Sequence, residues 1–195
     1  MSRAEADLLL IRRCQKGDRA AFDSLVSQYE QRAYQYAFRL TRDQDEACDV
    51  VADAFVRVYS AVKNFKGKSS FSTWLYRIVS NVYFDRRKRE RRHTHLSLDA
   101  PVGSDESRTL DIADSGDGPE ELAEHGARED VLNSALNSLP ELHRAMLVMF
   151  HLEGLSYVEI AEAMDLPVGT VKSRLNRARV ALRDEVGTAM ELFEV

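Results

Sequence analysis

The fold is decided by a stretch near the C-terminus, Tyr157-Val-Glu-Ile-Ala-Glu-Ala-Met-Asp-Leu-Pro-Val-Gly-Thr-Val-Lys-Ser-Arg-Leu175. Ser156 and Glu159 have the spacing of a capping box, which predicts that a short helix begins at Tyr157. The residues Asp165-Leu-Pro167 predict a tight break, after which a longer helix runs over residues 168–182. A short helix, a brief turn and a longer helix are typical of a helix-turn-helix unit.

The longer helix has a basic outer side. Val171, Leu175 and Ala178 recur at spacings of four and three, so we expect them to point inward. Between Lys172 and Arg183 there are five basic residues and no acidic ones. Arginine and lysine suit guanine edges and phosphates, and asparagine suits adenine, so this helix is a candidate for reading DNA. The alternative is a structural helical hairpin with a solvated outer face.

The remainder of the chain also predicts an all-α protein. Nine glycines and four prolines among 195 residues favour long helices over a many-turned β fold. Apolar residues recur at helical spacing in four segments, namely residues 20–40, 45–62, 71–92 and 142–149. Ser138 and Glu141 again have capping-box spacing, with Pro140 in the first turn, and predict the start of the last of these helices.

The net charge of −5 is the sum of strongly basic and strongly acidic segments of the chain. Residues 63–92 contain ten basic and two acidic residues, whereas residues 93–131 contain two basic and eleven acidic residues. Residues 93–127 have no apolar periodicity, so we predict a flexible acidic linker there. Two helical domains are therefore expected, residues 1–92 and 128–195. The acidic linker is expected to visit the basic patches and to favour a compact free state.

Several classes of protein are excluded. The longest apolar run, Ala145–Phe150, is far shorter than the roughly 20 residues of a membrane span, so no membrane insertion is expected. Cys14 and Cys48 make neither a disulfide framework nor a zinc site, and we expect no metal and no cofactor. The N-terminus does not resemble a signal peptide, which favours the cytoplasm. No catalytic grouping is recognisable, so the protein is not expected to be an enzyme.

A second motif spans a loop and the first turns of the helix expected over residues 71–92. It reads Phe65-Lys-Gly-Lys-Ser-Ser-Phe-Ser-Thr-Trp-Leu-Tyr-Arg-Ile78. Its polar loop, broken at Gly67, offers amide donors beside aromatic rings on which an unstacked base could lie. Opening a duplex needs such a place, because unstacking costs a few kcal/mol per step. For Phe71 and Trp74 the favoured interpretation is core packing, and the polar and basic loop residues are the better candidates for DNA contact.

These two motifs together resemble the extracytoplasmic-function (ECF) sigma factors of bacterial RNA polymerase. The stretch around residues 157–175 resembles sigma region 4, preceded by Leu139-Pro140 and Leu152-Glu-Gly-Leu-Ser156. The Phe65–Ile78 stretch resembles regions 2.3 and 2.4, and Asp49-Val-Val-Ala-Asp-Ala-Phe55 resembles region 2.2. The resemblance covers about residues 8–92 and 130–186 and implies two small helical domains, a region 2 bundle and a region 4 helix-turn-helix, joined by a short linker.

The resemblance implies three sets of site residues. Those for reading and opening the minus-ten element are Asn64, Lys66, Gly67, Lys68, Ser69, Ser70, Arg77, Asn81 and Arg86. Those for reading the minus-thirty-five element are Thr170, Lys172, Ser173, Arg174, Asn176, Arg177 and Arg179. Those for binding core polymerase are Asp49, Asp53 and Phe55 at the clamp helices of the largest subunit, and Met146 and Glu153 at the flap.

The chain departs from the usual family pattern at two positions. Ala52 stands where glutamine is usual, which weakens or replaces one contact to the polymerase clamp. Asp165 stands at a turn position often filled by glycine, and because aspartate tolerates left-handed backbone, the turn is expected to survive.

The sequence therefore predicts a protein that binds core RNA polymerase and promoter DNA and directs initiation, with the catalysis supplied by the polymerase. The resemblance also implies a stress or signal regulon and an anti-sigma partner, often at the membrane. Two alternatives remain, a stand-alone helix-turn-helix regulator and a nucleic-acid-modifying enzyme. The first does not explain the N-terminal domain.

Overall fold

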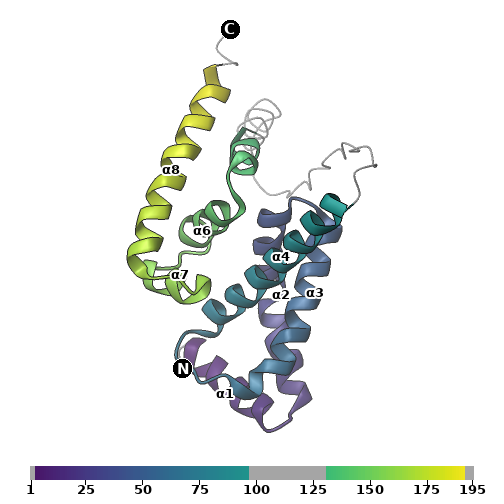
Figure 1. The fold of residues 1–195 in the computed structure, drawn as a ribbon. Helices are drawn as coiled ribbons and strands as arrows, with labels where there is room; N and C mark the ends of the chain where they lie inside the picture. The colour runs from purple at the N-terminus through teal and green to yellow at the C-terminus, as the bar shows by residue number, and fades with distance from the viewer. Residues whose placement is uncertain (1–2, 97–130, 192–195) are drawn as a thin grey trace, which may run out of the picture.

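The computed structural model describes residues 3–96 and 131–191, and every element within those ranges is helical (Figure 1). The N-terminal unit consists of four α-helices and one turn of 3₁₀-helix. Their bounds are α1 Arg3–Gln15, α2 Arg19–Thr41, α3 Gln44–Ala61, η1 Val62–Asn64 and α4 Phe71–Leu96. The C-terminal unit contains a helical segment at residues 131–138, followed by α6 Glu141–His151, α7 Tyr157–Met164 and α8 Val168–Glu191.

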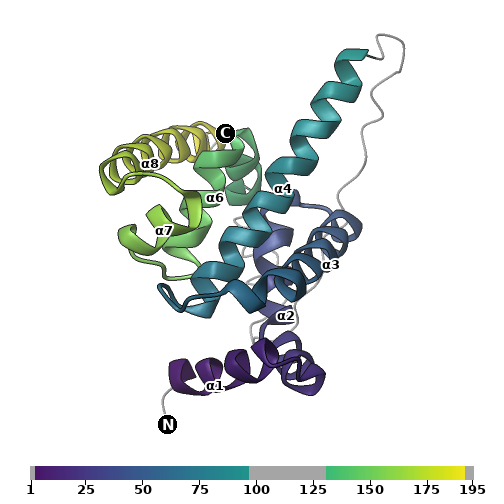
Figure 2. The same ribbon diagram turned by 60° about the horizontal axis from the view of Figure 1, so that its bottom comes forward.

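The N-terminal unit folds because its helices carry apolar stripes. Asp18 and Asp43 accept hydrogen bonds from backbone N–H groups in the first turns of α2 and α3, which fixes where these helices begin. Behind the caps, α2, α3 and α4 pack on one another around Leu25, Val50 and Val79, all of which have no exposed surface. Figure 2 shows α1 crossing the end of this bundle.

The helix-turn-helix prediction is confirmed. Ser156 and Glu159 form a reciprocal capping box at the start of α7, and Asp165 ends that helix with left-handed backbone at φ 53°. Val171, Leu175 and Ala178 of α8 are fully buried, as their spacing predicted. Leu166 and Pro167 complete the turn, so α8 leaves α7 with one fixed side turned inward.

Three details differ from expectation. The helix expected to end at Arg92 continues to Leu96, into the segment that we assigned to the linker; the rest of that segment lies outside the described residues. Helix α8 likewise continues to Glu191. The capping box expected at Ser138 is wrong: α6 begins after Pro140, and the Ser138 hydroxyl donates to the Ala135 carbonyl. A residue before proline avoids helical backbone, which delays the start of the helix.

The two units lie in contact. Helix α7 packs against α4, and α6 packs against α2, so the C-terminal unit rests on one flank of the N-terminal bundle (Figure 1). Over the described residues, no helix is long and apolar enough to cross a membrane.

Candidate nucleic-acid and polymerase interfaces

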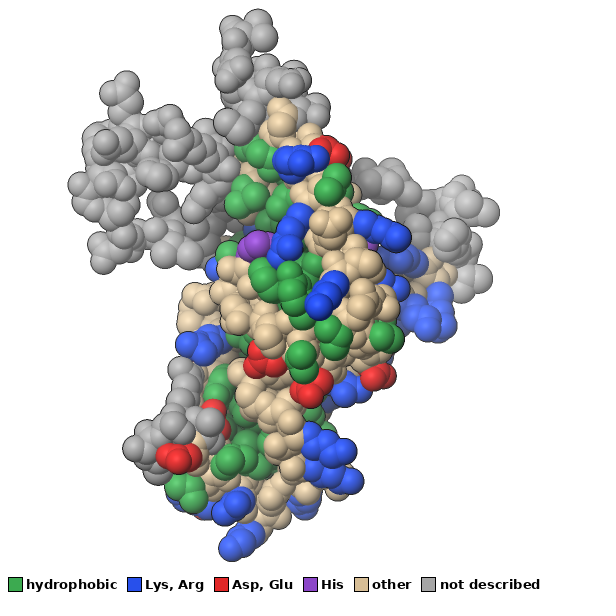
Figure 3. Space-filling view, turned by 90° about the vertical axis from the view of Figure 1, so that its left-hand side faces the viewer, with side chains coloured by type: hydrophobic (Ala, Val, Ile, Leu, Met, Phe, Trp, Pro, Cys, Tyr) green, Lys and Arg blue, Asp and Glu red, His purple; other side chains and the backbone are tan. Residues whose placement is uncertain are grey.

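The outer side of α8 presents the residues expected to read the minus-thirty-five element. Lys172, Ser173, Asn176 and Arg177 are exposed, while Thr170, Arg174 and Arg179 are half-buried. Figure 3 faces this side of the molecule and shows Lys and Arg side chains recurring over it. Within the described ranges, no carboxylate lies at ion-pair distance from Lys172, Arg174 or Arg177. Their charges are therefore available to a polyanion.

Two cations of this surface are steadied by aromatic rings. The Arg179 guanidinium lies 4.7 Å from the centre of the Phe150 ring and donates to His151 Nε2 at 3.2 Å. The Lys172 ammonium lies 5.9 Å from the centre of the Tyr157 ring. Cations over ring faces are attracted by the negative face of the ring, which limits their motion without neutralising them.

The pKa of His143 on α6 is affected by the positive charge of this surface. Partial burial, and after it the charges of Arg174 and Arg177, lower the pKa of His143. The pKa of His151 is lowered in the same way, by partial burial and then by Arg179. Both imidazoles are therefore biased toward the neutral form beside these arginines.

The second DNA-reading candidate is the loop that joins η1 to α4. Asn64, Lys66, Gly67, Lys68 and Ser70 are exposed, and Ser69 is half-buried. The Ser70 hydroxyl accepts from the Thr73 backbone N–H, which caps α4 and ends the loop. Phe71 is buried, as expected, and Trp74 packs half-buried beside it. The polar groups of the loop are therefore exposed to solvent, next to the packed rings of Phe71 and Trp74.

Four basic residues of α4, unlike Lys172, Arg174 and Arg177 of α8, have acidic partners among the described residues: Arg77, Arg86, Arg87 and Arg91. Arg86 pairs with Asp49 at 2.8 Å and with Asp53 at 3.1 Å. A residue expected to contact DNA therefore contacts two residues expected to contact polymerase. Asn81 is exposed, and Arg77 lies 3.8 Å from Asp165 at the end of α7.

Two of the residues expected to bind core polymerase are buried in this conformation, and their assignment to the polymerase stays a prediction. Met146 has no exposed surface and Phe55 is only 9% exposed. Both are apolar residues on the inward stripe of an amphipathic helix, so they pack into the core. Asp49 and Asp53 are exposed on α3, beside the departure at Ala52, which is also exposed.

The remaining polymerase candidate, Glu153, lies between the two units. Its carboxylate pairs with Arg39 of α2 at 3.1 Å, accepts from the Tyr76 hydroxyl of α4, and has a side chain only 10% exposed. Burial first, and then the hydrogen bond to this carboxylate, raises the pKa of Tyr76. In this conformation Glu153 therefore faces the N-terminal unit and is not available to a partner.

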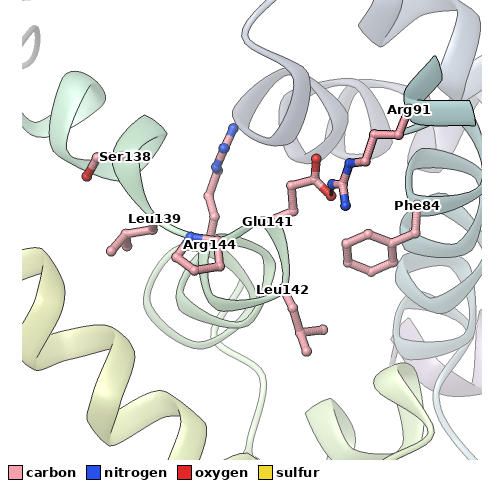
Figure 4. A pocket seen from close by; sticks show the side chains of 8 residues that line it. Phe84, Arg91, Ser138, Leu139, Glu141, Leu142 and Arg144 are labelled. Atoms are coloured by element: carbon pink, nitrogen blue, oxygen red, sulfur yellow. Dashed lines mark ion pairs between the residues drawn. The ribbon is translucent and has the colours of Figure 1, made fainter. Parts of the chain in front are cut away.

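A second polar contact between the units lies on α6. Buried Arg144 donates to the Leu40 carbonyl at the end of α2 at 2.8 Å. Glu141 pairs with Arg91 of α4 at 2.5 Å. Figure 4 shows Arg91, Glu141 and Arg144 around a crevice of about 640 Å³ between α4 and α6, which Phe84 and Leu142 also line.

The contact between units also reaches one residue of the expected minus-ten set, Arg77, which stays exposed. Thr73 of α4 donates to Glu159 of α7 at 3.4 Å, and Arg77 pairs with Asp165 one turn further along. The sequence did not reveal Arg39 or Arg144 as contact residues. The only available signal was that Arg144 directly precedes the longest apolar run of the chain.

Comparisons with known proteins match both helical units. The Sigma-70 region 2 family model matches residues 25–93, and the Sigma-70 region 4 family model matches residues 129–182. The ECF RNA polymerase sigma factor SigW of Bacillus subtilis is 34% identical over 90% of this chain and 94% of its own length. The ECF RNA polymerase sigma-E factor of Escherichia coli K12 is 36% identical over 95% of this chain and 97% of its own length.

Solved structures show the same fold. The sigma factor RpoE in complex with the anti-sigma factor NepR from Bartonella quintana superposes with a TM-score of 0.67 at 23% identity, covering 85% of this chain and 96% of that chain. CnrH in complex with the cytosolic domain of CnrY superposes with a TM-score of 0.65 at 26% identity, covering 94% of this chain and 98% of that chain.

Region 2 and region 4 thus occur in order, in two helical units of the expected architecture, with relatives above 30% identity along almost the whole length. The chain belongs to the ECF sigma factors, non-enzymatic initiation factors that bind core RNA polymerase and direct it to promoter DNA.

Proposed function

We propose that the outer side of α8 reads the minus-thirty-five element and that the loop 64–70, with α4, reads and opens the minus-ten element. The observation that carries the first half is the set of cations, on the second helix of a helix-turn-helix, that have no acidic partner among the described residues. Arg174 and Asn176 are the base-reading candidates, because arginine and asparagine form paired hydrogen bonds with guanine and adenine edges. Lys172 and Arg177 suit phosphates.

The clamp of the polymerase is bound through Asp49 and Asp53 on the exposed side of α3. Their carboxylates are held by Arg86 in the free chain, so binding exchanges one cationic partner for another. Residues 1–92 form the unit for core and minus-ten binding, 93–127 the linker and 128–195 the minus-thirty-five unit. The bonds of the transcript are made by the polymerase, and the chain itself is not an enzyme.

The place of action is the cytoplasm, where the polymerase works, and the regulon answers a stress or another signal. The chain is held in check by an anti-sigma protein. Support for this comes from the first structural neighbour named above, which is a sigma factor bound to an anti-sigma factor.

The test is run-off transcription with purified core polymerase on a promoter library randomised at both elements. We expect enrichment of one sequence at each element. Arg174→Ala or Asn176→Ala should alter preference at one minus-thirty-five position by about 1–3 kcal/mol. Failure to support any promoter-specific transcript, or tight sequence-specific footprinting by the chain without polymerase, would favour a stand-alone regulator instead.

A further inference from the structure

Gln15, the last residue of α1, reaches the base of the loop 64–70. Its Nε2 donates to the Val62 carbonyl at 3.2 Å and to the Phe65 carbonyl at 2.9 Å. The Val62 carbonyl, at the start of η1, also accepts from the Phe65 N–H at 3.1 Å, and the Phe65 carbonyl follows the last residue of η1. A side-chain amide carries two N–H donors, so Gln15 uses both of them on one turn of backbone.

Helix α1 borders the same loop at a second point. Gly67 has left-handed backbone at φ +66°, and a methyl group added there would lie 3.7 Å from Leu8 Cδ2. Leu8 and Gln15 lie on the same helix, so α1 lies beside both the start of the loop and its turn. The position of α1 is therefore coupled to the conformation of the loop.

Phe65 is fixed from the opposite side as well. Its ring centre lies 4.8 Å from that of Trp74 and 6.4 Å from that of Phe71, at the start of α4. With its carbonyl held by Gln15 and its ring held by α4, Phe65 anchors the loop in one place. The neighbouring side chains of Asn64, Lys66 and Lys68 remain exposed.

We infer that Gln15 is a positioning residue for promoter recognition, which fixes the loop so that its polar groups meet the minus-ten element in one register. The inference rests on the proposed role of the loop in reading that element. Polar groups that are aligned before binding do not have to be ordered during binding. The binding free energy of the correct DNA sequence is therefore improved more than that of an incorrect one. Gln15 itself does not touch DNA and acts through the Val62 and Phe65 carbonyls.

The test compares three substitutions in the full chain bound to core polymerase, with the doubly randomised promoter library as the probe. Gln15→Ala removes both donors, and Gln15→Glu places carboxylate oxygens against carbonyl oxygens. Gln15→Lys keeps donors of similar reach and no acceptor. The matched control is Gln31→Ala, an exposed glutamine on α2.

We expect Gln15→Ala to reduce base preference at the minus-ten element about threefold to tenfold, in line with the loss of two hydrogen bonds. Gln15→Glu should reduce it further, Gln15→Lys should retain most of it, and Gln31→Ala should match the parent. Preference at the minus-thirty-five element is the internal reference and should not change in any variant.

Equal loss of preference at both elements would overturn the inference, because it would show that Gln15 only stabilises the fold. Unchanged minus-ten preference in both Gln15→Ala and Gln15→Glu would overturn it too. If the parent chain itself shows no minus-ten preference, the proposed function fails, and that result is visible before any variant is made.

Discussion

The two basic surfaces of the molecule differ in what their cations contact. On α8, Lys172, Arg174 and Arg177 have no acidic partner among the described residues, whereas on α4, Arg86 and Arg91 are both held in ion pairs. A count of basic residues therefore overstates the charge that α4 offers to DNA in this conformation. One surface can bind phosphates as it stands, and the other must first exchange its partners.

The largest effect should follow from removing the unpaired cations. The triple variant Lys172→Ala, Arg174→Ala and Arg177→Ala should weaken binding of the holoenzyme to a promoter about a hundredfold. The magnitude of the slope of log affinity against log salt should fall by about 1.8, because the phosphate contacts of Lys172 and Arg177 no longer release counterions. Fluorescence anisotropy over a salt series measures both quantities.

The matched control removes three exposed cations from a part of the chain that is not expected to face DNA, with Arg12, Lys16 and Arg19 changed to alanine. It should leave the salt slope within about half a unit of the parent value. An equal change of slope in both triple variants would mean that α8 acts only through net charge.

The next effect concerns Glu153, which holds the two units together. Glu153→Gln leaves the half-buried Arg39 without its carboxylate and weakens the bond from Tyr76, so the contact should open about tenfold more often. Energy transfer between dyes on the two units should fall in the free chain. The control is Glu162→Gln, at an exposed position of α7, which should leave the distance between the dyes unchanged. An unchanged distance in Glu153→Gln as well would show that Glu153 does not hold the two units in contact.

A smaller effect tests the pairing of Arg86. Asp49→Asn should raise the affinity of the free chain for an oligonucleotide about twofold to threefold, since an exposed ion pair contributes at most about 1 kcal/mol. The same change should weaken binding to core polymerase. Asp45→Asn, an equal change of charge at an exposed position of α3, is the control. Equal gains in both variants would show that Arg86 was already available.

The smallest effect is a dependence of DNA binding on pH. The pKa of His143 lies below its ordinary value in the free chain, by burial and by Arg174 and Arg177. Bound phosphates would offset those arginines and raise the pKa of His143, so binding takes up a proton and strengthens as pH falls toward 6, by at most about one log unit per pH unit. His143→Gln should flatten this profile, and a profile unchanged by the substitution would exclude the coupling.

Local signals predicted the helices and the inward side of α8 well. The capping box at Ser156, the left-handed turn at Asp165 and the buried Val171 are each fixed by residues within one or two turns. Ser138 shows where such a rule fails, because Pro140 changed which residue begins the helix. Patterns of this range determine which segments are helical and which side of each is apolar.

The partners of the charged residues could not be predicted from the sequence. Arg39 and Glu153 are far apart along the chain, and their contact depends on how two complete units pack. The same holds for Gln15, whose neighbours at Val62 and Phe65 are brought together by the bundle. Met146 was assigned to a surface by resemblance although its spacing placed it on an apolar stripe, and burial followed the spacing.

Helix α4 holds a row of polar residues at fixed distances along its axis, and these distances can be compared with the spacing of base pairs. Its exposed polar residues Arg77, Asn81, Lys88 and Arg92 extend over about 22 Å at 1.5 Å per residue. That length equals roughly six to seven base-pair steps of duplex at 3.4 Å each. One residue inserted in α4 would rotate all later side chains by about 100° about the helix axis and move them together by about 1.5 Å along it.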